Sequence, residues 1–312
     1  MAAPVVTSQT SQTSPTFAKQ RRREVLEAYL FIAPALLIIA VFVIYPAFRS
    51  LWLSFHEQIP FIGRLDFVGW QNYRNMFTGS FASSYRNSVR VTAWFTLFTV
   101  PSTVVLGLLI ALLINRDLPG MALFRSLIFV TVSVSTAVAA VAWGWLFNTQ
   151  IGFINYLLSF VGVPRIAWLT NPRVALFAIA VITIWQSLGF TAILLLSGLQ
   201  TISQDCLEVA CIDGANALQK LLYVTLPLLS PTLFIVTVLS VINSLTAFGQ
   251  VHILTRGGPG EATNLLVYNL YRDGFQNFRP GFASAQAFVL FIALGFITLL
   301  QFRVLGKRIH YQ

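Results

Sequence analysis

The segment that decides the fold reads Glu208-Val209-Ala210-Cys211-Ile212-Asp213-Gly214-Ala215, and Leu226-Pro227 follow it. It is a short polar stretch with a turn signal, and long apolar runs lie on both sides of it. A chain with several membrane spans rarely keeps a structured helix–turn–helix in so short a loop unless another protein docks there. The segment therefore predicts a membrane fold and, within it, a docking loop.

Local signals predict two short helices in this loop. Ser203 is suited to cap the first helix, and Asp213-Gly214 ends it because glycine readily takes the left-handed conformation. Asn216 and Gln219 have the spacing of a capping box for the second helix. Leu226-Pro227 mark the entry into the next apolar run, where proline in a first turn costs little. Spacing alone leaves open an ordinary amphipathic connector on the membrane surface.

Composition places most of the chain in lipid. Of 312 residues, 56% are hydrophobic and only 10% are charged, whereas soluble proteins carry roughly 25% charged residues. The net charge of +10 comes from scattered basic residues that form no patch, which excludes nucleic acid as the expected partner. Cys206 and Cys211 predict neither a disulfide framework nor a metal site, since no His lies near them.

The apolar runs predict an all-α integral membrane protein with six transmembrane helices, because a span needs about 20 apolar residues. We expect a disordered basic cytoplasmic tail over residues 1–28, a six-helix transmembrane domain over 29–305 with the loop at 199–227, and a cytoplasmic tail over 306–312. The six expected spans are Tyr29–Phe48, Val91–Ile114, Ser126–Phe147, Val174–Gly198, Leu228–Leu254 and Ser284–Phe302.

Orientation rests on the basic cluster before the first span. The 20 Lys and Arg residues divide evenly between the two sides, ten and ten, so the whole count does not decide. Arg21, Arg22 and Arg23 lie close to the first span, where basic residues count most, and they favour cytoplasmic N and C termini.

Polar side chains within the expected spans mark a candidate solute pathway. These spans contain no Asp, Glu, Lys or Arg, so a proton relay is not expected. Asn243, Thr246 and Gln250 are spaced to share one helical face, with Ser244 adjacent. The fourth expected span offers a second stripe with the same spacing, Thr183, Gln186 and Phe190, and Trp185 lies beside it. The alternative is that these groups join helices to one another.

A set of short motifs runs in order along almost the whole chain. They are Ala33-Pro34, Tyr45-Pro46, Leu53-Ser54-Phe55, Phe67-Val68-Gly69, Asn72-Tyr73, Leu112–Arg116, Phe124-Arg125, Asp213-Gly214-Ala215, Leu226-Pro227, Leu254-Thr255 and Gly257-Gly258-Pro259. With these motifs the chain resembles the sugar-type permeases of binding-protein-dependent ABC importers, the group that contains the membrane subunits of the maltose and glycerol-phosphate transporters. Val209 and Arg256 depart from the family pattern.

The resemblance implies a type I ABC importer transmembrane domain in the bacterial inner membrane. It implies a second permease subunit, a dimer of cytoplasmic ATPase subunits that bind ATP and Mg, and an extracytoplasmic solute-binding protein. This chain itself is expected to be no enzyme and to hold no cofactor or metal. The implied ATPase-coupling residues are Glu208, Ala210, Asp213, Gly214, Ala215, Leu226 and Pro227; the implied pathway residues are Asn243, Ser244, Thr246, Gln250, Trp185 and Gln186.

Two other classes of function stay open on the residues alone. A self-contained secondary transporter or channel for a neutral solute would work without an ATPase. A membrane anchor or assembly scaffold would tolerate apolar replacements in the polar stripes. The sequence does not identify the solute.

Overall fold

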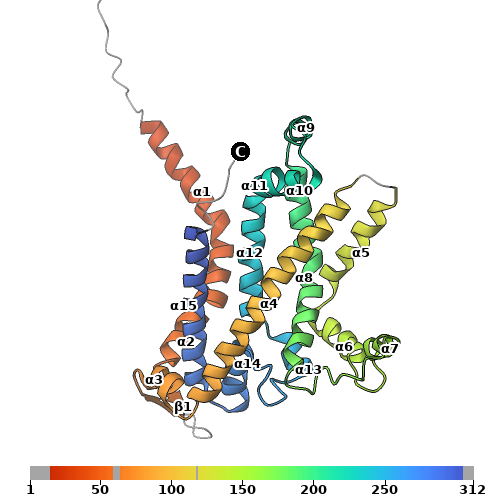
Figure 1. Cartoon of the computed structure of the whole chain (residues 1–312). Helices are drawn as coiled ribbons and strands as arrows, with labels where there is room; N and C mark the ends of the chain where they lie inside the picture. Colours follow the sequence, from red (N-terminus) through yellow and green to blue (C-terminus); the bar gives the residue numbers. More distant parts are fainter. Residues whose placement is uncertain (1–14, 59–63, 117–118, 305–312) are drawn as a thin grey trace, which may run out of the picture. The chain divides into compact units, whose positions relative to one another are not determined.

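The structure, a computed structural model, describes residues 15–58, 64–116 and 119–304 (Figure 1). It separates the chain into two compact units, Met1–Trp52 and Leu53–Gln312. Each unit is described by itself.

The first unit is one long apolar helix. It comprises α1 (Pro15–Ile39), the π-helical turn η1 (Ala40–Ile44) and most of α2 (Tyr45–Leu53). Residues Arg22–Leu53 are long and apolar enough to span a membrane. The π-helical turn lies directly before Pro46, which has no N–H to donate to the preceding turn. Because α1 begins at Pro15, the structure differs from the disordered tail expected over residues 15–28; residues 1–14 lie outside the described residues.

The second unit begins with a small hairpin and a short helix. Strands β1 (His56–Gln58) and β2 (Leu65–Phe67) pair antiparallel, with His56 opposite Phe67. Helix α3 (Gln71–Thr78) follows. The buried Asn72 side chain donates to the carbonyls of Ser54 at 2.9 Å and His56 at 3.0 Å. These bonds hold α3 against the chain that enters the unit.

Long apolar helices make up most of the second unit. Helix α8 lies at its centre and contacts α4, α5, α6, α12 and α13. The helices that make the spans are α4 (Ala82–Ile114), α5 (Met121–Ser133), α6 (Thr136–Leu146), α8 (Ala175–Gln200), α12 (Ser230–Leu245), α13 (Gly249–Leu254) and α15 (Pro280–Val304). The connecting elements are α7 (Phe153–Ser159), α9 (Gln204–Ile212), α10 (Ala217–Lys220), η2 (Leu221–Thr225), α11 (Leu226–Leu228), α14 (Leu266–Tyr271) and η3 (Arg272–Gln276).

The third expected span is broken. Helices α5 and α6 meet at an angle of 104°, so the described residues hold five candidate spans, or six when this bent pair is counted as one. The break follows Ser133, and the Ser135 hydroxyl accepts a hydrogen bond from the backbone N–H of Val138 to cap α6. The structure therefore has helices over most of the expected range Ser126–Phe147, but they form two helices and not one. The sequence could not show this, because an apolar run does not reveal where its backbone turns.

Small residues bring the central helices close together. A Cβ atom at Gly107 of α4 would meet the side chain of Thr191 on α8, and one at Gly198 would meet the side chain of Thr232 on α12. Such close approaches are typical of membrane helix pairs, where packing replaces the hydrophobic effect. Within this unit, the α9–α10 loop lies at one end, and α7, α13 and α14 lie at the other (Figure 1).

Candidate functional site

The loop between α8 and α12 folds as its sequence predicts. The Ser203 hydroxyl accepts from the backbone N–H of Asp205 at 3.2 Å, and α9 ends at Ile212. Gly214 follows with φ +78°, the left-handed conformation. Asn216 and Gln219 form the capping box, with hydrogen bonds of 2.8 and 2.9 Å. These capping groups thus fix the turn between the two helices of the loop.

The predicted docking residues divide by their surroundings. Glu208 and Asp213 are exposed, whereas Ala210 is buried, and its carbonyl accepts from the backbone N–H of Ala215 at 3.0 Å. No heavy atom lies within 4 Å of a Cβ built on Gly214. The backbone carbonyl of Ala210 therefore holds the turn, and its methyl group is buried. Gly214 is required by its backbone angle, because no neighbour lies close enough to exclude a Cβ atom.

Large apolar side chains are exposed on the same loop, and the sequence reasoning missed them. Ile212 is 83% exposed and Tyr223 is 77% exposed, and Leu218 is exposed as well. Exposed apolar patches of this kind mark surfaces for a protein partner or a membrane. The sequence alone did not single them out, since apolar and polar residues alternate irregularly along residues 203–227.

The loop is joined to the helix core at both ends. Leu207 of α9 and Leu228 of α11 pack against a buried cluster that includes Ala111, Leu195 and Leu229. Leu226 and Pro227, predicted to mark the entry into the next span, lie half-buried in α11. A displacement of the loop would therefore be transmitted directly to α4, α8 and α12.

A polar cavity lies between α6, α8 and the broken α12–α13 helix. Its volume is about 360 Å³, and no ionisable side chain lines it. A second cavity of about 200 Å³ shares Gln186, Ser187 and Asn243 with it. The residues that line the polar cavity are Thr136, Thr183, Gln186, Ser187, Asn243, Thr246, Ala247, Phe248, Gly249 and Gln250.

Two glutamine amides connect three elements in the wall of the polar cavity. The Gln186 amide nitrogen of α8 donates to the Val134 carbonyl at 3.1 Å and to the Thr136 hydroxyl at 3.2 Å. The Gln250 amide nitrogen of α13 donates to the Gln186 amide oxygen at 3.2 Å. This bridge joins the break between α5 and α6 to the fourth and fifth spans.

Four of the six predicted pathway residues line this cavity. Asn243, Thr246 and Gln250 do so although the helix stops at Leu245 and resumes at Gly249, so the predicted single helical face is wrong. Gln186 lines both cavities. The interruption turns the chain so that all three side chains still reach one space.

The other two predicted pathway residues pack helices together. Ser244 is buried and lines neither cavity; its hydroxyl bonds to the Thr96 hydroxyl at 2.8 Å and the Thr99 hydroxyl at 3.0 Å on α4. Trp185 packs edge-on against Trp143 of α6, with ring centroids 5.7 Å apart. For these residues the alternative stated at the outset, contact between helices, fits the structure.

Thr136, Ser187 and Phe248 line the polar cavity but were not singled out from the sequence. Thr136 follows the break between α5 and α6, and Phe248 lies in the interruption before α13, so neither position follows from a helical repeat. Thr183, which the sequence placed in a second polar stripe, does line the cavity.

A further polar cluster, centred on Arg272, lies at the opposite end of the unit from the α9–α10 loop. The guanidinium lies 2.7 Å from the Ser84 hydroxyl, 2.9 Å from the Glu261 carboxylate and 2.9 Å from the Asn269 side-chain oxygen. Glu261 follows the Gly257-Gly258-Pro259-Gly260 turn, so this cluster fixes the turn against α4 and α14. Across the described residues, no group of three or more His, Cys, Asp and Glu side chains could hold a metal ion.

Comparisons with known proteins connect this arrangement to a family. The family described as "Binding-protein-dependent transport system inner membrane component" matches residues 76–311. The chain is 35% identical over 290 residues to the "Trehalose/maltose transport system permease protein MalF" of Thermococcus litoralis, covering 92% of this chain and 96% of that protein. It is 32% identical over 284 residues to the "sn-glycerol-3-phosphate transport system permease protein UgpA" of Agrobacterium fabrum, covering 91% and 96%.

A solved structure shares the fold. It is described as a bacterial ABC transporter involved in the import of the acidic polysaccharide alginate. The match has a TM-score of 0.78 at 21% identity, and it covers 94% of this chain and 99% of that chain. The arrangement of helices is therefore that of an ABC importer transmembrane domain.

Proposed function

Because the chain belongs to the family of binding-protein-dependent transport system inner membrane components, we propose that it carries a neutral sugar or sugar-like solute across the membrane as the permease subunit of an ATP-driven importer. The family is one of transport subunits rather than enzymes, and its relatives include permeases for trehalose and maltose and for glycerol phosphate.

The single observation that carries the choice of a neutral solute is the lining of the polar cavity. Amides and hydroxyls both donate and accept hydrogen bonds, as sugar hydroxyls do. An anionic solute calls for Arg or Lys, which form the strong charge-assisted bonds to carboxylate and phosphate. No residue that lines this cavity carries a charge, and Phe248 adds an aromatic face. A neutral polyhydroxylated molecule matches this set of groups.

The α9–α10 loop is proposed as the site where a dimer of cytoplasmic ATPase subunits docks. Its exposed apolar side chains, with Glu208 and Asp213 beside them, offer both packing and charge to such a partner. Closure of the ATPase dimer on ATP would move the loop. The buried cluster that includes Ala111, Leu195 and Leu229 would carry that movement to the spans that line the cavity. ATP and Mg are then bound by the partner and not by this chain.

The remaining parts of the assembly follow from the same proposal. The α9–α10 end faces the cytoplasm, with both termini on that side of the bacterial inner membrane. The α7 and α14 end faces outward, toward a solute-binding protein. A second permease subunit completes the pathway.

The test is uptake by the reconstituted complex in proteoliposomes that contain ATP. We expect Asn243→Leu and Gln250→Leu to lower uptake of labelled maltose or trehalose strongly while the ATPase still co-purifies with the permease. Ser244→Ala is the matched control, because Ser244 is adjacent in sequence but lies outside the cavity. Loss of ATPase binding in the two cavity variants would favour a packing role for these side chains, and preferred uptake of glycerol phosphate would contradict a neutral solute.

A further inference from the structure

Helix α7 carries an exposed ridge of large apolar side chains. The α7 ridge consists of Phe153, Tyr156, Leu157 and Phe160, which are 49–70% exposed. Their spacing of three and four residues places them on one side of the helix. Phe153 stacks on Tyr156, and Tyr156 meets Phe160 edge-on with ring centroids 5.0 Å apart. Contiguous exposed apolar surface of this kind marks a binding face.

The opposite side of α7 fixes the ridge in its outward direction. The buried Asn155 side chain donates to the carbonyls of Thr149 at 3.2 Å and Ile166 at 2.9 Å, and it accepts from the Trp168 indole N–H at 3.1 Å. Ile154 packs against the cluster around Phe147. With this side bonded and packed, the ridge is presented outward and does not turn into the protein.

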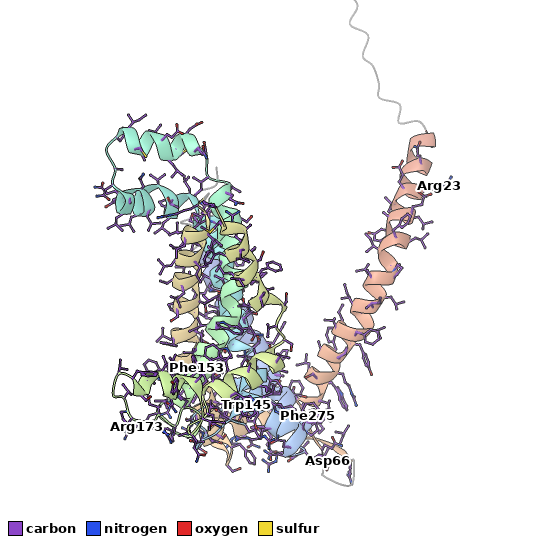
Figure 2. All side chains as sticks on the ribbon, turned by 90° about the vertical axis from the view of Figure 1, so that its right-hand side faces the viewer. Arg23, Asp66, Trp145, Phe153, Arg173 and Phe275 are labelled. Atoms are coloured by element: carbon purple, nitrogen blue, oxygen red, sulfur yellow. The ribbon has the colours of Figure 1, made fainter. Side chains whose placement is uncertain are left out.

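The length and place of α7 point to the membrane interface. Its 7 residues measure about 10 Å at 1.5 Å each, against roughly 30 Å for a bilayer core, so it cannot span. Trp145, at the end of the apolar helix α6, is also strongly exposed. Figure 2 places Trp145 and Phe153 near the same end of the helices. Aromatic side chains at this level are typical of the belt where the bilayer meets water.

A cationic cleft lies directly beside the ridge. Its volume is about 280 Å³, and Arg165 lines it together with Gln150, Tyr156 and Ser159. No acidic residue lines this cleft, and residues 148–173 contain no Asp or Glu at all. The cleft therefore favours an anion, and the adjoining ridge favours an apolar body attached to it.

We propose that α7 lies in the outer interface of the bilayer and binds an anionic phospholipid, with the lipid phosphate at Arg165 and the acyl chains along the α7 ridge. A lipid fits better than a protein partner because the exposed Trp145 lies at the same end of the helices as the ridge, as belt residues do. The cleft beside the ridge also contains Arg165 and no acidic residue. This lipid site is additional to the solute pathway and does not depend on which solute is carried.

The position of the ridge is tested with spin labels on the complete importer in nanodiscs. In a background of Cys206→Ser and Cys211→Ser, labels are attached at Phe160→Cys and, as the control, at Arg173→Cys. We expect the label at position 160 to relax faster with oxygen, which partitions into lipid, and the label at position 173 to relax faster with a water-soluble nickel complex. A label at 160 that is shielded from both reagents would mean that a protein covers the ridge, and this would overturn the proposal.

The lipid contact is tested by native mass spectrometry of the complex released from bilayers of phosphatidylglycerol and phosphatidylcholine. Arg165→Gln should lower retained phosphatidylglycerol roughly five-fold, the effect of one basic residue near an anionic membrane surface. Arg173→Gln, on the same loop but outside the cleft, should leave it unchanged. Equal loss in both variants, or full displacement of the lipid by inorganic phosphate, would refute a specific phospholipid site.

Discussion

Gly214 gives the sharpest test of the proposed docking loop, because the effect of its backbone angle can be separated from the effect of steric contact. Its φ of +78° lies in the left-handed region, and nothing lies within 4 Å of a Cβ placed on it. Gly214→Ala would therefore meet no clash within this chain. The added methyl would act only through the backbone angle, which costs an L-residue roughly 1–2 kcal/mol.

That penalty sets the expected loss of affinity for the ATPase. If docking requires the loop as the structure shows it, about 1.4 kcal/mol corresponds to a ten-fold weaker complex, so Gly214→Ala should weaken binding roughly 5- to 30-fold. Gly214→Asn should fall between alanine and the unaltered chain, since asparagine tolerates the left-handed conformation. The assay is biolayer interferometry of the purified ATPase on the permease pair in nanodiscs.

Gly120 supplies the matched control. It has φ +87° and equally open surroundings, but it lies before α5 in another loop. Gly120→Ala carries the same backbone penalty and should leave ATPase affinity unchanged. The reasoning fails if Gly214→Ala binds within about two-fold of the unaltered chain, or if asparagine is worse than alanine, because the backbone angle would then not be what the partner requires.

Three further predictions concern the interior. Ser244→Ala should lower stability by about 1 kcal/mol in thermal unfolding while uptake is retained; a loss of uptake at full stability would place Ser244 in the pathway instead. Gln186→Leu and Gln250→Leu should be non-additive in a double-mutant cycle, with a coupling of about 0.5–3 kcal/mol, and additivity would show that the amide bridge does not form in the membrane. Arg272→Gln should cost about 1.5–3 kcal/mol as charge-assisted bonds are lost, seen as faster proteolysis of the turn before Glu261, and unchanged proteolysis would rule out the anchoring role.

The sequence was most informative where one residue type imposes one local geometry. The caps at Ser203 and Asn216 and the left-handed turn at Gly214 depend on neighbours within four residues, and all three are confirmed. The apolar runs predicted six spans because the bilayer core has a fixed thickness, and the described residues hold five candidate spans, or six when the bent α5–α6 pair counts as one. Such features need no knowledge of the rest of the fold.

Breaks in the helices could not be predicted, and the cavity depends on them. Residues 126–147 and 228–254 read as continuous apolar runs, since composition does not report which carbonyls are left without a partner. The Arg272 cluster was also missed, because Ser84, which joins it to α4, lies far from Arg272 in sequence, whereas Glu261 and Asn269 lie close to it. Tertiary hydrogen bonds between distant polar residues leave no periodic signal.

The side-chain amide of Gln186 has two roles. It satisfies a backbone carbonyl freed by the break in the third span, and it also faces the space proposed for the solute. A change at this position that improved the fit to a new solute would at the same time expose the carbonyl of Val134. Selection for a different cargo is therefore freer to act at Asn243 and Thr246, which are exposed to the cavity, while residue 186 is constrained by the fold.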